Sequence, residues 1–268
     1  MEKVLLHTPE GVRDVYGKEC AVKLTIENSI NKVFNIYGYH NIQTPTFEFF
    51  DIFSKERGSV ASKNLYKFFD REGNTLVLRP DVTPSIARLV AKYYMDVKVP
   101  VKLCYNANTY INNSELQGKL KENTQLGCEL INDDSVEADA EILALVVDSL
   151  KAAGLKEFLV EIGHADFYKG LLEECGFDTE NEQELRKRIE NKNYFGVEEI
   201  LDNNNITGQL KEAFLKLPEL FGSIDVIKSA KELTDNKKAL QSIERLEKLY
   251  SILEDYGVSK YISFDLGM

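Results

Sequence analysis

Two side chains suited to holding an α-ammonium group stand close together in the stretch LRPDVTPSIARLVAK, residues 78–92. Asp81 offers a carboxylate and Thr83 offers a hydroxyl, and both can accept hydrogen bonds from an ammonium group. They lie where a predicted strand gives way to a predicted helix. The alternative is structural, because Asp and Thr also cap helices by bonding the free N–H groups of the first turn.

A second pair of polar side chains lies on the predicted strand TQLGCELI, residues 124–131. Its period-two pattern places Gln125 and Glu129 on the same side of the strand. Gly127 between them would leave room for a ligand over the sheet. The Glu129 carboxylate could then accept a hydrogen bond from an imidazole N–H, or it could face solvent without a ligand.

The hairpin that ends in this strand lacks the arginines that a site for ATP phosphates would be expected to carry. The stretch YINNSELQGKLKENTQLGCELI, residues 110–131, holds lysines but no arginine, and residues 89–185 contain none. TPEGVRDVYG, residues 8–17, lacks the GxxxxGK pattern of a phosphate-binding loop. His7, His40 and His164 are scattered, with no carboxylate or serine at a recognisable spacing, so no catalytic group is indicated.

Composition narrows the class of protein and of partner. The 268 residues are 43% hydrophobic and 29% charged, which is typical of a packed globular protein. A net charge of −11 argues against a nucleic-acid partner, which clustered lysine and arginine would serve. No apolar run approaches the ~20 residues that cross a membrane, so we expect a cytoplasmic protein. Four widely separated cysteines predict neither a zinc site nor disulfides, and no cofactor is indicated.

Hydrophobic spacing predicts the elements that position these side chains. Val22, Ile26, Ile30 and Val33 recur at helical spacing, which predicts a helix over residues 18–37. An extended stretch over 42–50 is broken by Pro45, which belongs at a sheet edge or a kink. Further strands are predicted at 65–69, 74–79, 101–111, 124–131 and 157–163, and helices after RPDVTP and over 136–153.

The character of the sequence changes after Asp166. From there to about Tyr256 the pattern is helical, charged and nearly free of strands, and KYISFDLGM, residues 260–268, returns to strand character. We therefore expect an α+β fold with a core over 1–165, a helical insertion subdomain over 166–257, and a return strand of the core over 258–268. Because the chain stops on a strand, we expect it to be a fragment of a longer protein.

Several of these stretches, taken in order, resemble histidyl-tRNA synthetases. They are TPEGVRDVYGKE, the helix that follows it, YGYHNIQTPTFEFFDIF, LVLRPDVTPSIARLVA and TQLGCELI. The likeness is clear over about residues 8–165 and looser over the helical region. It implies a class II aminoacyl-tRNA synthetase-like core, an antiparallel sheet flanked by helices. It also implies a homodimer, with Pro45 of the first class II motif at the dimer interface.

The resemblance assigns a histidine-binding role to both polar pairs. Asp81 stands where the family has a carboxylate that meets the α-amino group of the ligand, and Thr83 stands beside it. Gln125 matches a residue near the same amino group, and Glu129 matches one that meets the imidazole. The resemblance therefore implies that the histidine half of the site is kept.

The ATP half of the synthetase site looks degenerate. In synthetases the second class II motif carries an arginine, followed two residues later by a glutamate. Here Ile111 and Asn113 take those places, and Lys119 stands where the loop usually has arginine. An isoleucine offers no cation to the α-phosphate of ATP during adenylation.

A histidine pocket without its ATP half resembles the synthetase-like regulatory subunits of ATP phosphoribosyltransferase. That family implies a subunit without its own catalysis, which pairs with and activates a short-form catalytic subunit. It further implies a part in allosteric feedback inhibition by L-histidine, in the first step of histidine biosynthesis. FDLGM resembles the lead-in to the family's second histidine motif, whose arginine and tyrosines would follow Met268. The alternatives are a working histidyl-tRNA synthetase and a dimerising scaffold whose pocket is vestigial.

Overall fold

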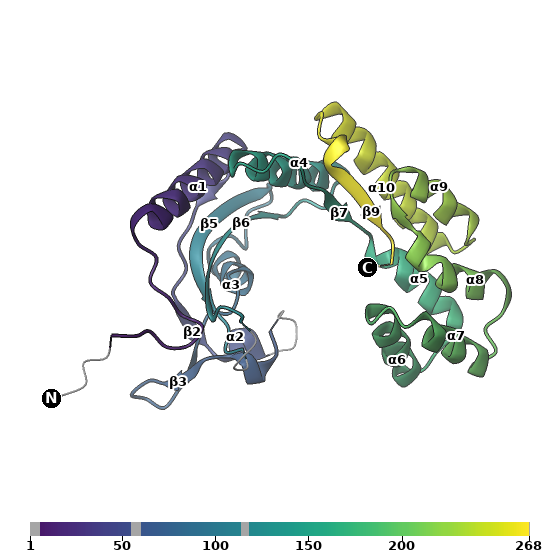
Figure 1. The fold of residues 1–268 in the computed structure, drawn as a ribbon, viewed down its shortest axis with the longest axis horizontal. Coiled ribbons are helices and arrows are strands. Elements are labelled where there is room, and N and C mark those ends of the chain that lie inside the picture. Colours follow the sequence, from purple (N-terminus) through teal and green to yellow (C-terminus); the bar gives the residue numbers. More distant parts are fainter. Residues whose placement is uncertain (1–5, 55–59, 114–117, 268) are drawn as a thin grey trace. The chain divides into compact units, whose positions relative to one another are not determined.

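The structure of the protein is a computed structural model that describes residues 6–54, 60–113 and 118–267. It divides into two compact units (Figure 1). The first contains the chain up to residue 133 and residues 148–154, and the second contains 134–147 and everything after 154. Helix α4 (Val136–Ala152) contributes to both units. The expectations for the start of the chain, for the centre of the 110–131 hairpin loop and for the end at Met268 lie partly outside the described residues.

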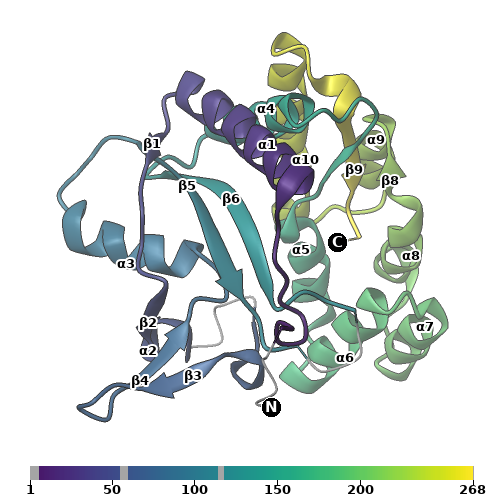
Figure 2. The same cartoon turned by 60° about the vertical axis from the view of Figure 1, so that its left-hand side comes forward.

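A long antiparallel hairpin forms the middle of the first unit. It pairs β5 (Val101–Tyr110) with β6 (Glu122–Ile131) along their whole lengths, as the alternating pattern predicts. One face packs against α3 (Thr83–Tyr93), where Ile86 of the helix meets Leu103 and Tyr105 of the sheet in a buried cluster. Helix α3 lies beside the hairpin in both views (Figures 1 and 2). The strands predicted at 101–111 and 124–131 and the helix predicted after RPDVTP are therefore confirmed.

The opposite face of the hairpin meets α1 (Gly17–Ile36) through polar contacts. Asn106 of β5 donates its side-chain N–H to Glu27 of α1 at 2.9 Å. Phe34 is the buried side chain of this helix, whereas Val22 and Ile36 are 58% and 81% exposed. The helix is confirmed, but Val22 of its predicted apolar face lies in solvent within the first unit.

A second antiparallel sheet has the strand order β2 (Phe47–Phe49), β4 (Thr75–Leu78) and β3 (Lys67–Phe69). The break at Pro45 predicted within the stretch 42–50 is present, whereas the strand within that stretch is shorter than predicted. The structure has β1 (His40–Asn41), which pairs in parallel with β5, then irregular backbone through Pro45, then β2. Short helices α2 (Asp51–Ser54) and η1 (Ser62–Asn64) follow β2.

Arg79 joins three segments of the first unit. Its side chain is 6% exposed and follows β4 directly. Nη1 donates to the carbonyl oxygens of Thr44 and Pro45 at 2.8 and 3.2 Å, and Nε donates to that of Asn108 in β5 at 2.8 Å. This one side chain therefore supplies donors both to the irregular backbone around Pro45 and to β5.

The second unit is built from helices around a small three-stranded sheet. The sheet has the order β7 (Val160–Ile162), β9 (Ile262–Asp265) and β8 (Phe221–Gly222), with β7 parallel to β9. Helical character after residue 165 is confirmed by α5 (Ala165–Cys175), α6 (Thr179–Glu190), α7 (Tyr194–Asn203), α8 (Gly208–Lys216), α9 (Asp225–Glu232) and α10 (Lys237–Asp255), with short η2 (Leu217–Glu219) and η3 (Ser259–Tyr261). The division at 165 and 257 stays a prediction. Within the described ranges, no helix has the length and apolarity that a bilayer crossing demands.

Replacing Arg79 by methionine should lower the free energy of unfolding strongly. The change would remove the guanidinium donors of the partly buried carbonyl oxygens of Thr44, Pro45 and Asn108, at a cost of roughly 3 kcal/mol. Urea unfolding would measure it. Arg71, exposed in the turn between β3 and β4, is the matched control, and Arg71→Met should change stability by less than about 0.5 kcal/mol. Equal unfolding midpoints for both variants would contradict this role of Arg79.

Candidate functional site

The four side chains predicted to bind a ligand come together on the α3 face of the hairpin. Gln125 Nε2 donates to Asp81 Oδ1 at 3.3 Å, and the Thr83 hydroxyl donates to Glu129 Oε1 at 2.7 Å. Two pairs therefore bridge the start of α3 and strand β6. The sequence pattern placed Gln125 and Glu129 on one face, and the structure adds that this face meets Asp81 and Thr83.

Asp81 serves the backbone and leaves one oxygen for a ligand. Its Oδ1 accepts the N–H of Val82 at 2.7 Å and that of Thr83 at 3.4 Å, where α3 begins. The helix-start interpretation of Asp81 is therefore correct for this oxygen. Among the described residues, Oδ2 of Asp81 and Oε2 of Glu129 accept no hydrogen bond, so each carboxylate keeps an acceptor for a ligand.

Tyr105 belongs to the same group of side chains, and the sequence reasoning missed it. It lies opposite Gly127 in the β5–β6 register and is 4% exposed. A Cβ atom built on Gly127 would lie 2.4 Å from the Tyr105 hydroxyl. The expectation that Gly127 leaves room for a ligand is therefore wrong at that point, because the phenol ring of Tyr105 fills the space. Pairing the two strands by register would have identified this residue.

The electrostatics of the group favour a ligand that carries N–H donors. Burial raises the pKa of Glu129; the Asp81 carboxylate adds to this rise, and the hydrogen bond from Thr83 opposes it. Burial, together with the charge of Glu129, raises the pKa of Tyr105 to about 12, so its hydroxyl stays protonated. Two carboxylates thus lie on one face without a cation among these five residues, and a cationic or donor-rich ligand would compensate their charge.

The positions that serve ATP in synthetases are occupied differently. Ile111 lies just beyond β5, is half-buried, and donates its backbone N–H to Lys121 at 2.9 Å. Asn113 donates its side-chain N–H to the carbonyl oxygen of Leu120 at 3.3 Å, which closes the end of the hairpin. Lys119 is exposed. That Ile111, Asn113 and Lys119 replace the ATP-side residues of a synthetase stays a prediction.

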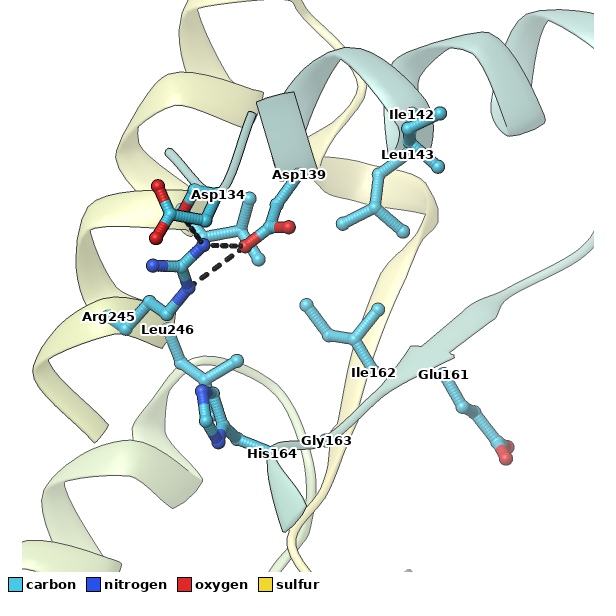
Figure 3. A pocket seen from close by; sticks show the side chains of 11 residues that line it. Asp134, Asp139, Ile142, Leu143, Glu161, Ile162, Gly163, His164, Arg245 and Leu246 are labelled. Atoms are coloured by element: carbon cyan, nitrogen blue, oxygen red, sulfur yellow. Dashed lines mark hydrogen bonds and ion pairs between the residues drawn. The ribbon is translucent and has the colours of Figure 1, made fainter. Parts of the chain in front are cut away.

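A separate cavity of about 710 Å³ lies in the second unit (Figure 3). Arg245 of α10 donates through Nε and Nη2 to Asp139 of α4, at 2.9 and 2.6 Å, and through Nη2 to the carbonyl oxygen of Asp134. His164 accepts the backbone N–H of Asp166 with Nδ1 and so caps α5. These polar groups stabilise the packing of α10 on the start of α4, and no predicted site residue lies among them.

Within the described ranges, no three His, Cys, Asp or Glu side chains are grouped as a metal site requires.

The sequence matches a family model described as histidyl-tRNA synthetase over residues 11–268. Among solved structures, a histidyl-tRNA synthetase from Nostoc sp. PCC 7120 superposes with a TM-score of 0.81. That comparison covers 99% of this chain and 62% of the other at 18% sequence identity, so it shows the fold alone. The expected fold class, a synthetase-like α+β core with antiparallel sheets flanked by helices, is confirmed.

Curated relatives carry a more specific name. The ATP phosphoribosyltransferase regulatory subunit of Ruminiclostridium cellulolyticum is 47% identical over 268 residues, which are 100% of this chain and 64% of the relative. The same subunit of Acetivibrio thermocellus is 42% identical, over 98% of this chain and 63% of the relative. The chain thus spans less than two thirds of the length of these two relatives.

In two further comparisons the chain covers a larger share of the matched protein. The regulatory subunit of Thermoanaerobacter pseudethanolicus is 42% identical over 98% of this chain and 68% of its own length. A crystal structure described as an ATP phosphoribosyltransferase regulatory subunit/histidyl-tRNA synthetase from Bacillus halodurans C matches with a TM-score of 0.90. It is 36% identical over 99% of this chain and 69% of that chain. The chain therefore belongs to the histidyl-tRNA synthetase-like family of ATP phosphoribosyltransferase regulatory subunits.

Proposed function

We propose that the protein is a regulatory subunit of ATP phosphoribosyltransferase without catalysis of its own, working in the cytoplasm. It pairs with a short-form catalytic subunit, activates it, and takes part in feedback inhibition by L-histidine. The observation that carries the proposal is the hairpin face itself. The polar pairs Asp81–Gln125 and Thr83–Glu129 are assembled there. The resemblance to synthetases further implies that Ile111 takes the place of their ATP-binding arginine.

The chemistry of the assembled face suits free histidine. The α-ammonium group would bond to the open oxygen of Asp81, and an imidazole N–H would bond to the open oxygen of Glu129. Both contacts are hydrogen bonds from an N–H donor to a carboxylate oxygen. The Tyr105 hydroxyl, which stays protonated, is hydrogen-bonded to Thr83 and so helps to position the hydroxyl that bonds Glu129.

We also propose an isologous homodimer that uses the outer face of the β2–β4–β3 sheet. Phe47, Phe49 and Phe68 lie on that face by register and are 52%, 56% and 37% exposed. Phe47 and Phe68 contact each other edge to face, with ring centroids 5.8 Å apart. An exposed apolar group of this size is typical of an interaction surface. The sheet continues from the segment that contains Pro45, which the family places at its two-fold interface.

Replacing Phe49 by aspartate should convert the dimer into a monomer. A carboxylate at the centre of an apolar two-fold contact meets its own copy and cannot be solvated there. Multi-angle light scattering at micromolar concentration would measure the mass. Phe195, exposed on α7, is the matched control, and Phe195→Asp should leave the dimer intact. A monomeric unmodified protein, or a dimer that survives Phe49→Asp, would rule out this interface.

Calorimetric titration of the full-length protein with L-histidine should depend on both carboxylates. Losing one charged hydrogen bond in Asp81→Asn or Glu129→Gln costs roughly 1.5–3 kcal/mol, which is about ten- to a hundredfold in affinity. Glu72→Gln, at an exposed turn of the same unit, should bind histidine as before. Unchanged affinity in both site variants would place the histidine elsewhere.

A stability measurement separates this binding role from a structural one. Because the pKa of Glu129 is raised above its ordinary value of 4.5, the folded state holds its proton more tightly than the unfolded state. The contribution of Glu129 to stability therefore falls as pH rises above that value and is unfavourable at pH 7. Glu129→Gln should consequently bind histidine less tightly without lowering the unfolding midpoint at pH 7.

Two enzyme assays distinguish regulation from aminoacylation. We expect the full-length protein to raise the turnover of a short-form ATP phosphoribosyltransferase, and L-histidine to reverse the gain. Histidine-dependent pyrophosphate exchange and tRNA charging should stay at background, since each missing electrostatic contact costs about 10²–10³ in rate. The double change Ile111→Arg with Asn113→Glu should not restore exchange.

The competing function is a working histidyl-tRNA synthetase in which an exposed lysine replaces the missing arginine. Lys119 is the candidate, because it lies in the same hairpin loop and is exposed. A lysine is a flexible point charge without the fork of a guanidinium. A clear exchange signal that disappears in Lys119→Ala would overturn the regulatory proposal and establish the synthetase.

A further inference from the structure

A groove of about 360 Å³ runs between α5 and α6 in the second unit. Tyr168, Leu172, Ile189 and Gly267 are among its lining residues, together with the charged residues Lys169, Glu182 and Arg186, which are called its rim here. The α5 members recur at helical spacing, so one whole face of that helix borders the groove. A cavity with an apolar floor and a few polar groups at its edge has the usual composition of a small-molecule site.

The rim carries a positive and a negative side chain, each with atoms that are available for further hydrogen bonds. Arg186 uses Nε to bond Glu190 at 2.9 Å, and its two terminal nitrogens have no partner among the described residues. The Glu182 carboxylate likewise has no ion-pair partner in the described part of the chain. A guanidinium can accept a carboxylate in a forked arrangement, and a free carboxylate can accept an ammonium group.

The hydroxyl of Tyr168 lies beneath this rim without a partner. Its oxygen is closed to solvent and makes no hydrogen bond to any described residue. Burial raises the pKa of Tyr168 to about 12, and Arg186, Glu182 and Glu190 are among the charges that act on it. The hydroxyl therefore stays protonated and lies close to the flexible side chains of α6. A buried hydroxyl without a partner is unusual in a folded protein and is expected where a ligand or water completes the bond.

We propose that the α5–α6 groove binds an α-amino acid with a ring side chain that carries a polar atom. The ring would pack on Leu172 and Ile189, and its nitrogen or oxygen would bond to the Tyr168 hydroxyl. Because this oxygen is closed to solvent, binding requires the side chains that cover it to turn outward. Arg186 would hold the carboxylate and Glu182 the ammonium group. This site consists of residues separate from Asp81, Thr83, Gln125 and Glu129, so it stands or falls independently of the proposed function.

Calorimetric titration tests the site in the double variant Asp81→Asn with Glu129→Gln, which removes the proposed histidine contacts of the first unit. The probes are L-histidine, L-tyrosine and L-phenylalanine. We expect one saturable site per chain, with a polar-ring amino acid binding roughly three- to tenfold more tightly than L-phenylalanine, as one hydrogen bond supplies. Adding Tyr168→Phe should abolish this preference, because the hydroxyl is its only source.

Matched variants on α6 check the rim. Arg186→Gln should weaken every probe at least tenfold, since a charged contact is lost. Lys187→Gln, next to it but outside the groove, should change nothing. Tyr168→Phe should leave the unfolding midpoint equal or higher, whereas a structural hydroxyl would lower it. Absence of saturable binding at millimolar concentration, equal losses for Arg186→Gln and Lys187→Gln, or a preference that survives Tyr168→Phe would overturn the proposal.

Discussion

A guanidinium removed from water needs acceptors for its N–H groups, and in the first unit that need brings three segments together. Arg79 bonds backbone oxygens of the segment containing Pro45 and of β5, and its own backbone N–H donates to Thr46. Asp81 follows two residues later, so the same contacts set where α3 begins. The position of the Asp81 carboxylate and the path of the chain toward the exposed phenylalanines thus depend on one buried side chain.

The pairing of charge in the two units follows different rules. In the first unit two carboxylates share a half-buried face, and burial raises the pKa of Glu129, with a further rise from the charge of Asp81. In the second unit, exposed charges pair along one helix, as in Arg186–Glu190 and Lys216–Glu212, and also between helices, as in Lys231–Glu247. Such exposed pairs contribute little to stability. An uncompensated acidic face is therefore the costly arrangement, and costly arrangements of this kind concentrate at binding sites.

The spacing of hydrophobic residues predicted those parts of the fold that depend on residues close together in the sequence. The alternation of TQLGCELI gave the shared face of Gln125 and Glu129, and helical spacing gave α1 and the helices after residue 165. Tyr105 escaped prediction because its place depends on which residue of the opposite strand it faces. The break of the stretch 42–50 at Pro45 was predicted, but the pattern does not reveal that Arg79 bonds the carbonyl oxygens of Thr44 and Pro45. Long-range hydrogen bonds leave no periodic trace in a sequence.

The sequence distance across these contacts has a consequence for folding order. The strands of the β5–β6 hairpin are joined by a short loop, so their ladder forms among residues close in the chain. The contact of Arg79 with Thr44 closes a loop of 35 residues, and that of Tyr37 with Asp148 one of 111. Closing longer loops costs more chain entropy before any contact compensates it. The hairpin is thus expected to be structured early, while the start of α3 takes its final position late in folding.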